Sequence, residues 1–241
     1  METKKPGMEN YREFLDRIHS FEKSETDYGN DYFTGNPSIA HKVGKDNKYK
    51  DFYGDTIVFN LDNDTKEKVA KYVDRLYQSA PECFSEKLKT DTFHMTLHDL
   101  SNSPVLQDVS TDVFENELRV IEKSKKTGKH QKIRMKTNYV FNMVNISLVL
   151  GLYPASEEDY NRLMELYYLF DDVRRLGYPL TPHITLGYYS LNGFDVGSAR
   201  RLEKVIRELN QNEFEIVLDT DNLYYQKFVS MNQYINVICL G

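Results

Sequence analysis

The chain carries His94-Met95-Thr96-Leu97 in its first half and His183-Ile184-Thr185-Leu186 in its second, two copies of the pattern histidine, apolar, threonine, apolar. We call these stretches the histidine motifs. In an extended strand, residues i and i+2 project to one face and residues i+1 and i+3 to the other. A motif in a strand therefore presents its imidazole and hydroxyl together, while its two apolar side chains anchor the strand in a core on the opposite face.

Hydrophobic periodicity around the motifs alternates between that of a strand and that of a helix. Strands are expected over 56–61, 93–100, 132–136, 139–152, 183–190, 214–218, 223–228 and 234–240. Helices are expected over 64–79, 107–123, 157–176 and 198–210. Each motif strand comes after a strand and a helix, so we expect two β-α-β halves related by an approximate twofold axis. The alternative is one α+β domain without internal symmetry.

The residues before the first of these strands have a different pattern. Apolar residues at helical spacing predict an amphipathic helix over 10–23. Residues 24–55 are rich in Gly, Asn, Asp and Tyr, which is typical of a long ordered loop or a lid. We therefore divide the chain into an N-terminal helix and loop, residues 1–55, and a domain over residues 56–241.

Size and composition limit the class of protein. The 241 residues, 40% hydrophobic and 28% charged, are typical of a soluble globular protein. A net charge of −6 argues against binding duplex DNA through a broad basic surface, and two cysteines cannot build a disulfide framework. The charged N-terminus lacks the apolar stretch of a signal peptide, and no apolar run is long enough to span a membrane. We expect a cytoplasmic monomer with no membrane partner.

Two histidines, one in each half of the chain, fit the chemistry of phosphodiester hydrolysis. In-line attack on phosphorus needs a base that activates water and an acid that protonates the leaving oxygen. Imidazole, with an unperturbed pKa near ~6.5, serves in either role. The threonine hydroxyls, on the same faces, can donate hydrogen bonds to the nonbridging oxygens. This arrangement requires no metal and no cofactor.

In these motifs the chain resembles the two-histidine (2H) phosphoesterase superfamily, which includes LigT-like cyclic phosphodiesterases and 2′-5′ RNA ligase relatives. The similarity runs from Thr56 to the C-terminus. It implies an α+β, two-lobed LigT-like fold, in which two antiparallel sheets flanked by helices surround a central cleft with a pseudo-twofold axis. It also implies that His94 and His183 act as acid and base, and that Thr96 and Thr185 bind phosphate. Which histidine is the acid stays open.

The chain departs from the family pattern in two places. Chains of the family often begin close to the first strand of the core, whereas 55 residues precede that strand here. These added residues could affect how substrate reaches the cleft. Many relatives carry Arg and Phe after the first motif, but this chain has His98 and Asp99.

Three further residues are candidates for substrate binding. His98 lies four positions after His94, so an uninterrupted strand places both on one face, where His98 could contact substrate or complete a metal site. The alternative is a histidine at the surface where the strand ends. Tyr189, on the face predicted for Thr185, and Tyr53, before the first core strand, are candidates for stacking on a base.

We therefore expect a metal-independent phosphodiesterase that hydrolyses a cyclic phosphate, on a 2′,3′-cyclic nucleotide or an RNA end, or a short oligonucleotide. Its catalytic residues are His94, His183, Thr96 and Thr185. One alternative is a protein that binds nucleotides or RNA ends without turnover. Another is a metal-dependent phosphohydrolase that uses His94, His98 and His183.

Overall fold

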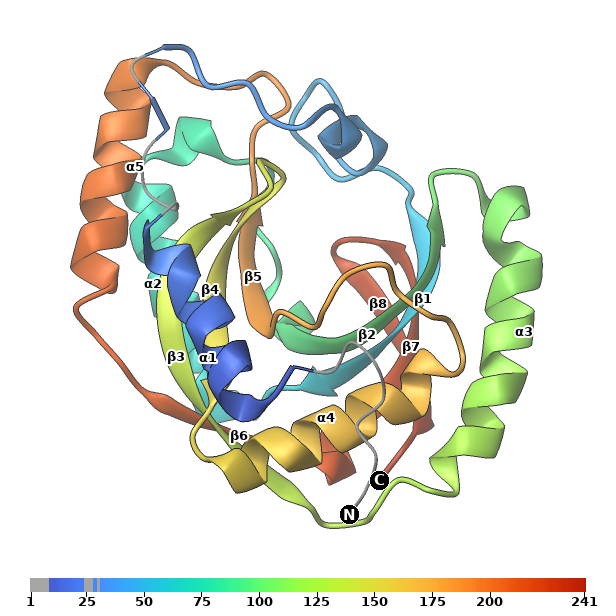
Figure 1. Cartoon of the computed structure of the whole chain (residues 1–241). Coiled ribbons are helices and arrows are strands. Elements are labelled where there is room, and N and C mark those ends of the chain that lie inside the picture. The colour runs from blue at the N-terminus through green and yellow to red at the C-terminus, as the bar shows by residue number, and fades with distance from the viewer. Residues whose placement is uncertain (1–8, 24–27, 30) are drawn as a thin grey trace.

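An antiparallel sheet of eight strands forms the frame of the part of the chain that the structure describes (Figure 1). The structure is a computed structural model and describes residues 9–23, 28–29 and 31–241. Across the sheet the strands are β6 (Glu215–Asp219), β3 (Lys132–Met143), β4 (Ser147–Pro154), β5 (His183–Tyr188), β2 (His94–Ser103), β1 (Tyr53–Asn60), β7 (Leu223–Ser230) and β8 (Gln233–Cys239).

The two motif strands, β2 and β5, lie next to each other at the centre of the sheet. Read outward from the centre, each lobe has the motif strand first, then the strand that precedes it in the chain, β1 or β4, then two more. This equivalence confirms the α+β class and the two related halves. The lobes were expected as two sheets, but a pairing of Met95 with Ile184 joins them into one curled sheet.

Five α-helices cover the sheet within the described residues. They are α1 (Tyr11–Ser20), α2 (Asn63–Ser79), α3 (Leu106–Ser124), α4 (Glu157–Asp171) and α5 (Val196–Leu209). Helix α3 packs on β1 and β2, whereas α2 and α5 pack together beside β5 and β3 (Figure 1). Helix α4 contacts strands of both lobes, β2 on one side and β3 and β4 on the other.

Helix α2 shows why these segments fold as predicted. Asp62 caps its first turn by accepting a hydrogen bond from the backbone N–H of Thr65, at 2.7 Å. The apolar positions at helical spacing, Val69, Val73 and Leu76, are fully buried, as the periodicity predicts. Burial of each of these side chains away from water contributes roughly 1.5–3 kcal/mol to the free energy of folding.

Two predicted boundaries are wrong. The expected strand over 139–152 is the end of β3, a turn and the start of β4; Val144 and Asn145 form the turn with φ angles of 47° and 59°. A valine at positive φ is uncommon, so the apolar run concealed the turn. Helix α4 ends at Asp171, five residues before the expected end at Leu176.

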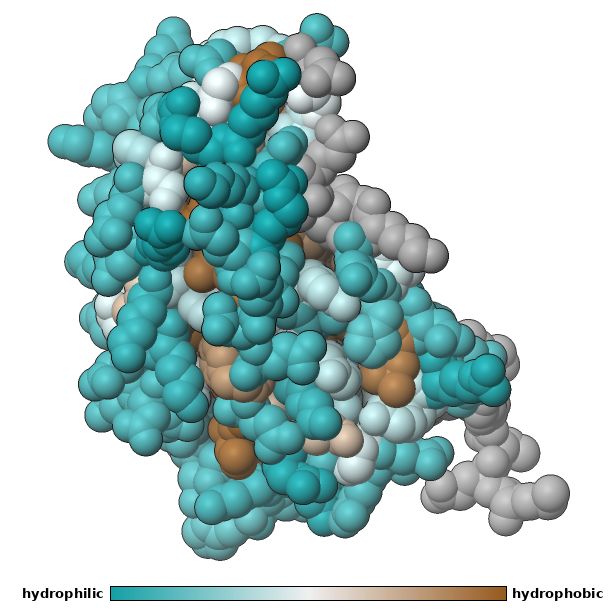
Figure 2. Space-filling model, turned by 90° about the vertical axis from the view of Figure 1, so that its left-hand side faces the viewer, coloured by the Kyte–Doolittle hydropathy of each residue, from teal (hydrophilic) through white to brown (hydrophobic). Residues whose placement is uncertain are grey.

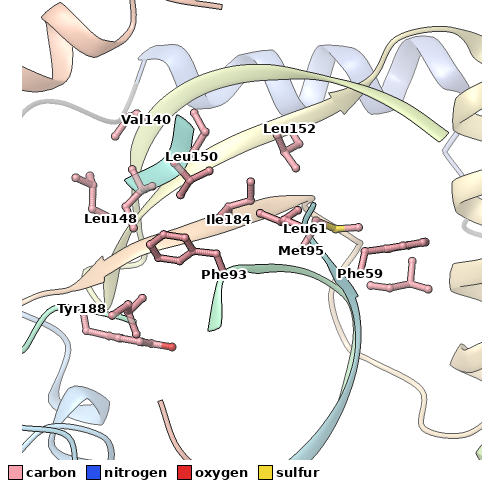
Figure 3. Close-up of a cluster of buried hydrophobic side chains, with 14 of the residues drawn as sticks. Phe59, Leu61, Phe93, Met95, Val140, Leu148, Leu150, Leu152, Ile184 and Tyr188 are labelled. Atoms are coloured by element: carbon pink, nitrogen blue, oxygen red, sulfur yellow. The ribbon is translucent and has the colours of Figure 1, made fainter. Parts of the chain in front are cut away.

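The buried apolar side chains of both lobes meet along the central strands. Figure 3 shows Met95 and Ile184 with Phe93, Leu148 and Leu150 in one cluster. Met95 and Ile184 are completely buried. The second residue of each motif therefore anchors its strand in the core, as the alternation predicts.

No helix of the described residues has the length and apolar character needed to cross a membrane.

The N-terminal residues that the structure describes belong to the same hydrophobic core. The predicted helix is confirmed as α1, followed by the 3-10 helix Phe21–Lys23. Helix α1 contacts β4 and α4 and buries Phe14 and Ile18. Residues 31–52 run along the top edge of the sheet in Figure 1 and include the 3-10 helix Pro37–His41.

The outer face on the side of α5 is mostly hydrophilic (Figure 2).

Candidate functional site

The first histidine motif ends in a β-bulge. Thr96 lies opposite Val58 of β1, and the preceding residue of β1, Ile57, lies opposite His98. Leu97 is therefore an extra residue without a partner. A bulge of this kind shifts the alternation of side chains by one position. Residues after Leu97 thus face the opposite way from the sequence prediction.

The second motif has a bulge at the same place. Thr185 lies opposite Val149 of β4, and Leu148 lies opposite Gly187. Leu186, the last residue of the motif, is the extra one here. Both motifs therefore share a pattern of two side chains, histidine and threonine, on one face, followed by a one-residue shift.

The four polar side chains of the motifs line a cavity of about 750 Å³ between the lobes. In the antiparallel register of β2 and β5, His94 lies opposite Thr185 and Thr96 opposite His183. All four side chains are partly exposed. Much of the remaining wall is aromatic or apolar: Phe21, Phe52, Tyr167, Tyr178, Tyr188, Phe228, Met231 and Tyr234.

Both imidazoles are held in the same way. Nδ1 of His94 is 2.8 Å from the carbonyl oxygen of Thr92, and Nδ1 of His183 is 2.7 Å from that of Thr181. A carbonyl oxygen only accepts, so each Nδ1 carries the hydrogen and donates. Nε2 is therefore the nitrogen that accepts a proton in the neutral ring and gives one up in the protonated ring.

The electrostatic environments of the two histidines are not equal. Burial lowers the pKa of His94 to about 4, against the opposing effect of the Thr92 carbonyl, and the positive charge of His183 lowers it further. Burial also lowers the pKa of His183. A protonated His183 therefore favours the neutral form of His94.

Asp99 is a member of the site that the sequence did not predict. It lies in β2 beyond the bulge, lines the cleft and accepts a hydrogen bond from the Tyr178 hydroxyl at 3.0 Å. Its negative charge raises the pKa of both His94 and His183, in opposition to burial. Nothing in the sequence marks the bulge, so an unbroken alternation assigns Asp99 to the wrong face.

His98 does not line the cleft. It is buried, with Nδ1 2.7 Å from the carbonyl oxygen of Asp99 and Nε2 3.5 Å from Oδ1 of Asp171 in α4. Its ring lies beside that of Tyr167, at 5.1 Å between centroids. The expectation that His98 shares the face of His94 is therefore wrong, because Leu97 interrupts the alternation. Among the described residues, no cluster of three or more His, Cys, Asp or Glu side chains is suitable for a metal ion.

The two tyrosine candidates also lie outside the cleft. Tyr189 is completely buried, and its hydroxyl is 2.7 Å from that of Tyr28. The bulge places Tyr188 in the cleft instead, at the position in β5 that Asp99 occupies in β2. The Tyr53 hydroxyl donates to Asp51 at 3.1 Å, and Tyr53 does not line the cavity.

A second cavity, of about 690 Å³, adjoins the first at Thr92, His94 and Tyr234, which line both. Its lining is rich in amides: Asn60, Gln226, Asn232, Gln233 and Asn236. Nε2 of Gln226 donates to Oδ1 of Asn60 at 3.1 Å and to Oδ1 of Asn236 at 2.6 Å. The space beside His94 is therefore aromatic on one side and polar on the other.

The N-terminal segment contributes two cations to the cleft, Arg17 of α1 and Lys42. Arg17 is paired with Glu9 at 2.6 Å and donates to the carbonyl oxygen of Leu180 at 2.8 Å. This arrangement fixes α1 against the loop that leads into β5. The sequence predicts a helix and a loop or a lid in this segment, but it marks neither cation as part of the site.

Comparisons with known proteins find solved structures with a similar fold. No model of a protein family and no curated protein sequence matches the chain. A conserved protein of unknown function from Agrobacterium tumefaciens is similar in structure, with a TM-score of 0.67 and 13% identity over 86% of this chain and 94% of that one. The chain also aligns with LigT of E. coli complexed with 3′-AMP, with a TM-score of 0.49 and 12% identity over 78% of this chain and 96% of that one. The first likeness shows the fold alone.

Proposed function

We propose that the chain is a 2H phosphoesterase, a metal-independent phosphodiesterase that hydrolyses a cyclic phosphate, on a 2′,3′-cyclic nucleotide or an RNA end, or a short oligonucleotide. One observation carries the proposal: the pairing of Met95 with Ile184 sets each histidine opposite the threonine of the other motif, and all four side chains line one cavity. Two imidazoles and two hydroxyls in one cavity offer an acid, a base and donors for the oxygens of a single phosphate.

In the proposed reaction, the phosphodiester lies between the two motifs. The hydroxyls of Thr96 and Thr185 donate to its nonbridging oxygens. Neutral His94 takes a proton from water through Nε2 while the water oxygen bonds to phosphorus. Protonated His183 gives its proton to the leaving oxygen as the bond from phosphorus to that oxygen breaks. The products are an alcohol and a phosphomonoester, and the next substrate enters after the two histidines exchange their extra proton with solvent.

The charges around the histidines support this assignment of base and acid. The charge of a protonated His183 lowers the pKa of His94, so His94 stays neutral beside it and can serve as the base. The Asp99 carboxylate supports protonated His183, because its negative charge raises the pKa of His183 and so opposes the effect of burial. A bound phosphate anion acts in the same direction.

The walls of the cleft favour a nucleotide as the substrate. Aromatic rings in the wall, such as the exposed Tyr178, provide surfaces on which a base can stack. The amide-rich cavity beyond His94 offers donors and acceptors to a second substituent on phosphorus. A linear diester therefore has space for both of its substituents.

The test is incubation with 2′,3′-cyclic nucleotides and 2′-5′ oligoadenylate, with and without EDTA. We expect turnover that survives EDTA and falls about 10²-fold or more in His94→Ala and in His183→Ala. His130→Ala is the matched control, because His130 is exposed and bonded to Asp221 away from the cleft. Activity lost on chelation would support a metal-dependent reaction, and binding without turnover would support a protein that only recognises nucleotides.

A further inference from the structure

Lys42 reaches the cleft from the N-terminal segment. Its backbone is fixed on both sides: its N–H donates to the carbonyl oxygen of Ile39 at 2.9 Å, and its carbonyl oxygen accepts from the N–H of Lys50 at 2.9 Å. The side chain is half-buried and lines the cavity. A fixed backbone beside the cleft restricts where the ammonium group can lie.

The ammonium group of Lys42 lies against two aromatic rings. Nζ is 5.2 Å from the ring centroid of Phe52 and 5.0 Å from that of Tyr188. Aromatic faces at this distance stabilise the positive charge. They do not occupy the three N–H donors of an ammonium group. Within the described part of the chain, no carboxylate and no hydrogen-bond acceptor is paired with Nζ of Lys42.

Two other cations of the N-terminal segment, Arg17 and Lys50, differ in this respect. Arg17, which also lines the cleft, is paired with Glu9. Nζ of Lys50 donates to the carbonyl oxygen of Ala40 at 2.9 Å. Lys42 thus combines a place in the cleft with donors that have no acceptor in the described residues.

Lys42 is displaced from the motifs along β5. Tyr188, one of the two rings beneath Nζ, lies three residues beyond Thr185. The charge on Lys42 nevertheless lowers the pKa of His183, so an anion in the cleft experiences both groups. A group held at Lys42 therefore lies in the same cavity as a phosphate held between the motifs.

We propose that Lys42 forms a second anion-binding site, and that the preferred substrate carries another phosphate beside the phosphodiester that is hydrolysed. This inference rests on the proposed function. The ammonium group donates to the second phosphate, while Phe52 and Tyr188 hold it in place. The added N-terminal segment then selects among substrates, because it supplies the cation that the motifs lack.

The test compares adenosine 2′,3′-cyclic phosphate with the same nucleotide carrying a 5′-phosphate. We expect the wild-type protein to hydrolyse the 5′-phosphorylated substrate with a kcat/KM about tenfold higher or more. Lys42→Met, which keeps an unbranched apolar side chain but has no ammonium group, removes this preference, and Lys42→Arg retains most of it. Lys48→Met is the control, because Lys48 is exposed in the same segment and does not line the cavity.

The outcomes separate this inference from the proposed function. Equal hydrolysis of the two substrates by the wild-type protein, or an equal loss on both in Lys42→Met, would overturn the second site. If neither substrate is hydrolysed, the proposed function fails, and calorimetry with adenosine 3′,5′-bisphosphate and adenosine 3′-monophosphate still tests Lys42. Tighter binding of the bisphosphate that disappears in Lys42→Met supports the site, and equal binding rejects it.

Discussion

Met95 of β2 pairs with Ile184 of β5, and among the described residues this is the one bridge between the two lobes of the sheet. Both side chains are completely buried, while the histidine and threonine on either side of each face the cleft. The relative position of the two imidazoles therefore depends on apolar packing at this residue pair, in addition to the contacts of α4 with both lobes. A substitution in this pair therefore affects the alignment of the reacting groups as well as the free energy of unfolding.

Replacing Ile184 by alanine tests this dependence. We expect the free energy of unfolding to fall by about 2–5 kcal/mol, because the change leaves a cavity in the core. We also expect kcat to fall about 10²-fold, because a small displacement of aligned groups is costly to the rate. Urea unfolding and steady-state kinetics measure the two effects.

Leu202→Ala is the control for the Ile184 variant. Leu202 is also completely buried, but it lies in α5 and does not line the cleft. A similar loss of stability with an unchanged kcat is expected. If both variants lose activity in proportion to stability, the bridge has no special role in alignment.

The dependence of kcat/KM on pH tests which histidine is the base. The pKa of His94 is lowered to about 4, and His94 must be neutral to accept a proton, so it produces the rise in rate with increasing pH. His183 must be protonated, so it produces the fall in rate at higher pH. We expect His94→Gln to flatten the rising limb and His183→Gln to flatten the falling limb. The opposite pattern would exchange the two roles.

Asp99→Asn tests the carboxylate that the bulge brings into the cleft. The negative charge of Asp99 raises the pKa of both histidines, so its removal lowers both values. The rising and the falling limb should then both move to lower pH, and activity on the alkaline side should drop. Asparagine keeps an oxygen that can accept from Tyr178. Asp108→Asn, an exposed change on α3, should leave the profile unmoved.

Periodicity was sufficient to predict the motif strands and the helices, because their hydrophobic patterns are long and regular. Helix α2 begins one residue from its predicted start and ends at the predicted residue. Periodicity failed where a single residue changes the backbone. The turn at Val144 and Asn145 lies inside an apolar run, and although Asn is a residue type that favours positive φ, Val is not.

The same limit explains the errors at the site. The positions of His94 and Thr96 follow from the alternation before the bulge. The positions of His98 and Tyr189 depend on the alternation after it, and the extra residue in each strand moves both away from the cleft. The contribution of Lys42 depends on tertiary packing of a loop, which no local pattern reveals.

The contrast between Thr96 and His98 gives a direct test of the bulge in β2. The Thr96 hydroxyl faces the cleft, so Thr96→Ala removes one donor to the phosphate and should lower kcat about 10²-fold. The stability of this variant should stay within about 1 kcal/mol of the wild-type value, because the side chain is partly exposed. Thermal unfolding and single-substrate kinetics measure both quantities.

His98→Ala should have the opposite effects. His98 is buried and bonded to the Asp99 carbonyl and to Asp171, so its removal leaves a cavity and unpaired acceptors, at a cost of about 2–4 kcal/mol. At a temperature well below unfolding, kcat should remain within about threefold of the wild-type value, since a residue that does not touch substrate affects the rate only indirectly. A loss of activity in His98→Ala as large as that in Thr96→Ala, without a loss of stability, would mean that the strand continues unbroken and that His98 faces the substrate.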